Sequence, residues 1–227
     1  MSESRDIDGW PKLEARMASA TEVHAFGQAT LIYNYLEEVT GRMLVYYLPT
    51  DIEFSEALFH RMGNPDRMLL LTRLIEGQER DSDIIEALKH FIRCYDICTE
   101  NRNILMHASL EPRTSPDILP LSKRSKDMRV GKIFFHLKLS DIRGAADEMG
   151  DVFDYGTRLK LWLTYRSDHD PELAKMMGWP SYPARPPLPD KPQKPRKLSL
   201  FQPPKDQPSD TSPPAPSQGM RPGGSKG

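Results

Sequence analysis

Hydrophobic positions recur at spacings of three and four residues over most of the first 178 residues, which places them on one side of a helix. The first such stripe runs from Ala25 to Tyr46 and stops at Pro49, whose ring cannot continue a helix. Two shorter stripes follow, over residues 54–58 and 65–77. The pattern therefore predicts one long helix and then two short ones.

Two further long stripes predict helices over residues 82–105 and 140–165. Between residues 109 and 132 the periodicity gives way to proline, serine and basic residues, which predicts a long basic surface loop. Residues 132–139 are rich in aromatic and apolar side chains, and this favours a short strand before the last helix.

Amphipathic helices of this kind bury their stripes only against one another, so we expect an all-α, up-and-down helical bundle. Proline marks where the bundle ends, because 14 of the 21 prolines lie after residue 178. The same stretch carries 8 basic and 3 acidic residues, whereas residues 1–178 are acidic overall. We therefore expect a flexible segment over 1–20, a bundle domain over 21–178 and a disordered, Pro-rich basic tail over 179–227.

Composition also limits the class of protein. No apolar run approaches the roughly 18 residues needed to span a bilayer, and the first residues lack the pattern of an export signal. Cys94 and Cys98 lie one helical turn apart, a poor basis for a disulfide framework, so we expect a cytoplasmic protein. His90 extends this spacing, but a fourth metal ligand is missing, and the cysteines are better read as core residues. We predict neither a metal nor a cofactor.

One charged residue interrupts the apolar stripe of the predicted helix over 82–105. Arg102 occupies a stripe position, where a guanidinium is costly to bury without a partner. It begins the run Arg102-Asn103-Ile104-Leu105-Met106-His107, in which Asn103 and His107 lie one turn apart on one helix face. Polar groups therefore gather near the end of this helix.

This run resembles the signature of the HEPN superfamily, helical-bundle proteins in which an arginine, often followed by a polar residue, precedes a histidine with four to six residues between them. The resemblance implies a metal-independent endoribonuclease, with a homodimer that forms a composite cleft on RNA. Attack by the 2′-hydroxyl of the RNA would leave a 2′,3′-cyclic phosphate. Arg102 would hold the phosphate, Asn103 would orient the backbone or imidazole, and His107 would exchange a proton. Such proteins often serve as toxins or defence effectors, which also implies a cognate inhibitor protein.

Basic residues of the predicted loop follow the motif directly and could steer RNA phosphates towards it. The candidate RNA-binding residues are Lys123, Arg124, Lys126 and Arg129. An equally simple interpretation is a solvated loop that its own charge keeps extended. In the tail, Pro189, Pro192 and Pro195 favour a polyproline helix, which suits either an aromatic-lined groove or a solubilising appendage without a partner.

A structural interpretation of the motif stays open beside the catalytic one. Arg102 could pair with an acid of the first or last helix, such as Glu37 or Asp147, and His107 could be an exposed residue at a helix C-terminus. The chain would then be a non-catalytic interaction or RNA-binding protein with the same bundle. Geometry adds a difficulty for catalysis, because residues five apart lie ~140° apart around an ideal helix. The placement of Arg102 decides between these interpretations.

Overall fold

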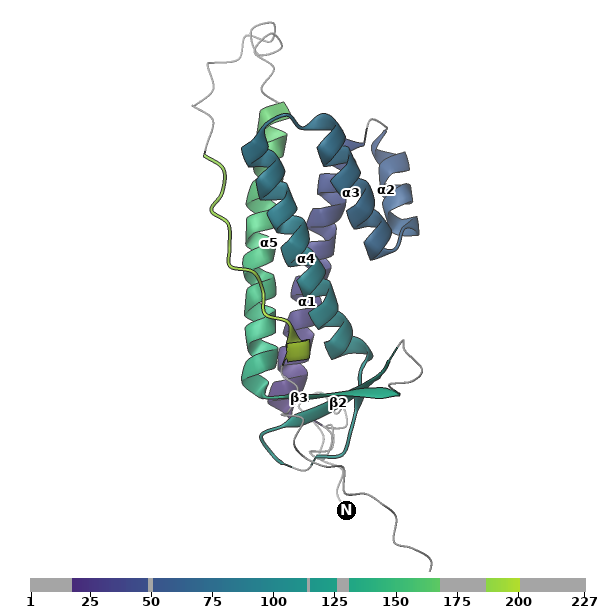
Figure 1. Cartoon of the computed structure of the whole chain (residues 1–227), viewed down its shortest axis with the longest axis vertical. Coiled ribbons are helices and arrows are strands. Elements are labelled where there is room, and N and C mark those ends of the chain that lie inside the picture. Colours follow the sequence, from purple (N-terminus) through teal and green to yellow (C-terminus); the bar gives the residue numbers. More distant parts are fainter. Residues whose placement is uncertain (1–17, 49–50, 114, 126–130, 168–186, 201–227) are drawn as a thin grey trace, which may run out of the picture.

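The structure is a computed structural model that describes residues 18–48, 51–113, 115–125, 131–167 and 187–200. Three long helices run side by side, two short ones cover one flank, and a small sheet closes one end of the bundle (Figure 1). The helices are α1 (Ala20–Tyr47), α2 (Ile52–Arg61), α3 (Asn64–Gln78), α4 (Ser82–His107) and α5 (Leu139–Ser167), and a 3-10 turn, η1, covers Leu198–Leu200. The predicted all-α bundle is confirmed. None of the described helices combines the length and apolar character that a membrane span requires.

Local sequence explains where the first helix begins and what it packs against. Ser19 caps α1: its hydroxyl accepts from the backbone of Glu22, whose carboxylate in turn accepts from the Ser19 N–H. The apolar stripe of α1 faces the core of the bundle. Leu36 of α1 has no exposed surface there, and the same holds for Leu88 of α4 and Leu159 of α5. Helices α1 and α5 share the most extensive contact, so they form the spine of the bundle.

Glycine allows two close approaches between elements. A Cβ at Gly156 of α5 would lie 2.4 Å from the Phe91 ring of α4, and a Cβ at Gly41 of α1 would lie 2.9 Å from the Phe59 ring of α2. Neither ring could keep its place against a larger side chain. These two glycines therefore set how closely α4 approaches α5 and α2 approaches α1.

A three-stranded antiparallel sheet occupies the stretch that the sequence predicts as a loop. Its strands are β1 (Ser109–Leu110), β2 (Leu119–Arg124) and β3 (Lys132–Leu137), in that order. β3 confirms the predicted strand, but β2 corrects the loop prediction. Leu119 and Leu121 of β2 are buried, and Leu121 pairs with Phe135 of β3. Residues 119–122 are all buried, so β2 lacks the alternation that marks a half-buried strand, and Pro120 and the basic residues after it add to the appearance of a loop.

Part of the predicted tail is packed against the bundle. Residues 187–200 run along α4 and α5 (Figure 1), and Leu198 is only 2% exposed. The described part of the tail therefore differs from the disordered appendage that composition predicts, because it supplies an apolar anchor and several hydrogen-bonding groups. The remainder of residues 179–227, and residues 1–17 of the predicted N-terminal segment, lie outside the described residues.

Candidate functional site

The arginine and histidine of the motif contact each other within one chain. Nη1 of Arg102 lies 3.0 Å from Nε2 of His107, and the same Nη1 donates to Oδ1 of Asn103 at 3.2 Å. The ~140° between Arg102 and His107 is bridged by the length of the arginine, which reaches around the last turn of α4. All three residues of the predicted catalytic set therefore converge. Of the three, His107 is the most exposed.

A polar network beneath the arginine holds it in place. The Arg102 guanidinium carbon lies 5.4 Å from the centre of the Tyr33 ring of α1. The hydroxyl of Tyr33 accepts from Asn64 at 2.7 Å, shares a 2.9 Å hydrogen bond with Thr99 and donates to Tyr95 at 3.4 Å. Burial raises the pKa of Tyr33, although its hydrogen bonds with Thr99 and Tyr95 act against this. The ring is thereby fixed by α1, α3 and α4 together.

The sequence did not single out Tyr33 and Asn64, which support the site. Tyr33 lies four residues after Ala29 and three before Leu36, so the helical period could have placed it on the buried stripe. Asn64 carries no comparable signal, since its role depends on the way α3 folds back onto α1.

The carboxylates that the structural interpretation assigned to Arg102 are placed elsewhere. Glu37 pairs with Arg67 of α3 at 3.3 Å, and Asp147 is exposed on α5. Among the described residues Arg102 forms no ion pair, and its buried Nε has no hydrogen-bond partner. The guanidinium thus retains hydrogen-bonding capacity, which an anion at this position could use.

The sheet fixes the end of the helix that carries the site. The Ala108 N–H closes α4 on the Ile104 carbonyl, and Ser109 pairs with Ser122 of β2 immediately afterwards. This pairing brings the next residue of β2, Lys123, to the His107 end of α4. Arg124 follows it and is exposed. The other two predicted RNA-binding residues lie outside the described part of the chain: Lys126 and Arg129.

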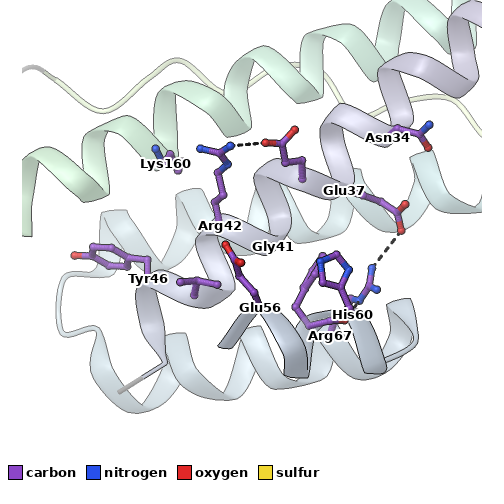
Figure 2. A pocket seen from close by; sticks show the side chains of 12 residues that line it. Asn34, Glu37, Gly41, Arg42, Tyr46, Glu56, His60, Arg67 and Lys160 are labelled. Atoms are coloured by element: carbon purple, nitrogen blue, oxygen red, sulfur yellow. Dashed lines mark hydrogen bonds and ion pairs between the residues drawn. The ribbon is translucent and has the colours of Figure 1, made fainter. Parts of the chain in front are cut away.

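A second polar cluster lines a pocket of about 730 Å³ on the flank formed by α1, α2 and α3. Figure 2 shows Glu37 and Arg67 facing each other on one side of the pocket, with Arg42 of α1 and Lys160 of α5 on another. Arg42 forms an ion pair with Glu38. Arg67 is further held by Asn64 at 3.0 Å, the residue that also donates to Tyr33. Glu37 and Glu38 are therefore each paired with an arginine of this pocket, and the pocket connects with the site through Asn64.

The histidine and cysteines at four-residue spacing do not form a metal centre in the described structure. Nε2 of His90 lies 2.9 Å from the carbonyl of Pro192 and 3.5 Å from Sγ of Cys94. Burial raises the pKa of the Cys94 thiol to about 11 and that of Cys98 further, which disfavours the thiolate form that binds metal. Within the described residues, no three His, Cys, Asp or Glu side chains form a group that could hold a metal ion.

Comparison of the chain with models of protein families, with curated proteins and with solved structures finds no match.

Proposed function

We propose that the protein is a metal-independent endoribonuclease that cleaves RNA at the Arg102–His107 pair. The observation that carries the proposal is the 3.0 Å contact between Nη1 of Arg102 and Nε2 of His107, in a position where Arg102 has no carboxylate partner among the described residues. A guanidinium without a carboxylate partner keeps donors for a phosphate, whereas a paired acid would compete with that phosphate.

The geometry favours His107 as the general base. Arginine only donates hydrogen bonds, so Nε2 of His107 is the acceptor and the imidazole proton resides on Nδ1. When a phosphate takes the guanidinium, Nε2 is released and can accept the proton of the adjacent 2′-hydroxyl. Attack of that oxygen on phosphorus forms the cyclic phosphate and breaks the bond to the 5′-oxygen of the next nucleotide, which leaves with a proton from water. Arg102 stabilises the charge that develops on the phosphate oxygens, and Asn103 keeps the guanidinium oriented.

Two features of the surface support RNA binding and dimerisation. Lys123 and Arg124 supply positive charge at the same end of α4. On α1, Val23, Leu31 and Tyr35 are 44%, 54% and 55% exposed at four- or eight-residue spacing, which gives the helix an apolar outer stripe. This stripe is a candidate surface for a second copy of the chain.

The decisive experiment incubates the full chain with labelled RNA in the presence of a chelator. We expect cleavage that leaves cyclic phosphate ends and that falls at least about 100-fold in Arg102→Ala and in His107→Ala. The matched controls are Arg93→Ala on the exposed face of α4 and His24→Ala on the exposed face of α1, which should retain full activity. Equal cleavage in all five proteins would reveal a contaminating nuclease and refute the assignment.

RNA binding without any cleavage, weakened by Arg102→Ala, would favour the non-catalytic alternative. Light scattering tests the homodimer, which a monomer at micromolar concentration would contradict. A role as a toxin or defence effector, opposed by a cognate inhibitor, rests on the motif resemblance alone. Cell growth during expression of the wild type and of His107→Ala tests it.

A further inference from the structure

The described part of the tail has a repeating sequence that suits an extended conformation. Residues 189–197 read as three consecutive Pro-x-Lys triplets, Pro-Asp-Lys, Pro-Gln-Lys and Pro-Arg-Lys. A polyproline helix has three residues per turn, so it places the prolines along one edge and the lysines along another. The segment contains neither helix nor strand until η1 begins at Leu198.

The length of this segment matches the helix beside it. Lys191 binds Glu86 of α4 at 2.7 Å, and Lys197 binds Glu100 at 2.8 Å. Six residues of polyproline helix span ~19 Å, and the fourteen residues of α-helix between the two glutamates span ~21 Å. The segment therefore runs parallel to α4, with its two outer lysines in register with two acids of the helix.

Main-chain atoms of the segment are bound by two side chains of α4. Asn101 is only 1% exposed; its Nδ2 donates to the Arg196 carbonyl at 2.7 Å, and its Oδ1 accepts from the Leu198 N–H at 2.9 Å. His90 donates from Nε2 to the Pro192 carbonyl at 2.9 Å. The side chain of Leu198 is buried at the end of the segment, where η1 contacts α4 and β3. The segment is thus held by main-chain hydrogen bonds and by one buried apolar side chain, as a peptide is held in a peptide-binding groove.

Charge adds selectivity to these contacts. The α4–α5 groove, by which we mean the surface formed by His90, Asn101, Glu86, Glu100 and Glu148, presents three acids to the segment. Arg196 meets the last of them at 2.8 Å. Most of these contacts lie at the surface, where water can replace the partners once the segment leaves. The bundle does not need the segment to satisfy Asn101, because an unoccupied groove would be open to solvent.

We propose that the α4–α5 groove is a recognition site for Pro-rich, lysine-bearing peptides and that residues 187–200 are its tethered, displaceable ligand. The preformed extended conformation lowers the entropy lost on binding, as in other polyproline ligands. Tethering keeps the local concentration of the segment in the range of about 1 mM, so a free peptide must compete with it. This proposal does not depend on ribonuclease activity.

The test uses a fluorescent peptide of residues 187–200 and the full chain. Arg196→Glu with Lys197→Glu weakens the chain's own segment by placing acids opposite Glu148 and Glu100. Fluorescence anisotropy should show the labelled peptide binding this variant at least about 10-fold more tightly than the wild-type chain, whose groove is occupied. Leu198→Asp in the chain should act in the same way. Because its position is buried, circular dichroism must first show that the helices are retained.

Two controls make the result specific. Adding Asn101→Ala to the charge-reversed chain should weaken peptide binding about 10-fold, and a peptide with Leu198→Asp should not bind any of the chains. Absence of peptide binding to both opened variants in folded form would overturn the proposal. If the free peptide separated a dimer of the wild-type chain into monomers, the segment would belong to a second copy, and the assignment of a tethered ligand would be wrong.

Discussion

Gly156 allows a quantitative test of how closely α4 and α5 pack. A Cβ at this position would lie 2.4 Å from Cε2 of Phe91, whose ring has no exposed surface. Gly150 lies on the same helix, and a Cβ there would meet nothing within 4 Å. Replacing a helical glycine by alanine raises the free energy of unfolding by about 1 kcal/mol through propensity alone. This gain is common to both positions, so the difference between the two variants isolates the packing cost.

Forcing a methyl group into a filled core costs about 1–3 kcal/mol. We therefore expect Gly150→Ala to be stabilised and Gly156→Ala to be about 1–3 kcal/mol less stable than Gly150→Ala. Urea denaturation followed by far-UV circular dichroism measures this difference. In a chain of this size, each kcal/mol also moves the melting temperature by roughly 2–4 °C. Equal stability of the two variants would show that α4 and α5 are not packed around Phe91 as described.

Three further predictions concern the polar groups. Burial raises the pKa of Glu22, but hydrogen bonds from Ser19 and Arg113 outweigh this effect and hold the pKa below its ordinary value of 4.5. The contribution of the Glu22 carboxylate to the stability of the fold is therefore present above pH 4.5 and is lost as the pH falls. Glu22→Gln should cost about 1–2 kcal/mol at neutral pH and flatten the acid limb of a stability–pH curve. Tyr33→Phe leaves an amide of Asn64 without its acceptor and should cost about 1–2 kcal/mol in urea denaturation, yet RNA cleavage should persist because the ring remains under the guanidinium. Burial raises the pKa of the Cys94 thiol to about 11. In the native protein this thiol should therefore react with an aromatic disulfide reagent only as fast as the fold opens. The rate of absorbance change with and without urea measures this.

The sequence predicts the helices well because each carries a long apolar period and a chemical stop. Pro49 ends the first stripe, and the structure ends α1 at Tyr47. Strand β2 could not be recognised in the same way: its buried Leu119 and Leu121 flank Pro120, and its neighbour β1 has only two residues. A short strand is stabilised by its pairing with neighbouring strands, and the local sequence pattern carries no information about that pairing.

The candidate site divides along the same line. The order of Arg102, Asn103 and His107 along the chain indicates that they could act together. The ~140° between Arg102 and His107 around an ideal helix argues against a contact between these two side chains. Only the structure shows the arginine reaching back to the imidazole. The role of Asn101 was not predictable, because a buried amide that binds a segment 95 residues away has no local signature.

The Pro-x-Lys repeat has a consequence for alignment of the tail on the helix. A shift of three residues that brings Pro195 to the place of Leu198 would superimpose proline on proline and lysine on lysine, but it would leave Oδ1 of Asn101 facing Pro195, which has no N–H to donate. The Leu198 N–H and the buried Leu198 side chain therefore both distinguish the observed frame from this one. Leu198→Pro, which removes both, should therefore allow the segment to shift by three residues, and amide resonances along α4 should then broaden through exchange between the frames.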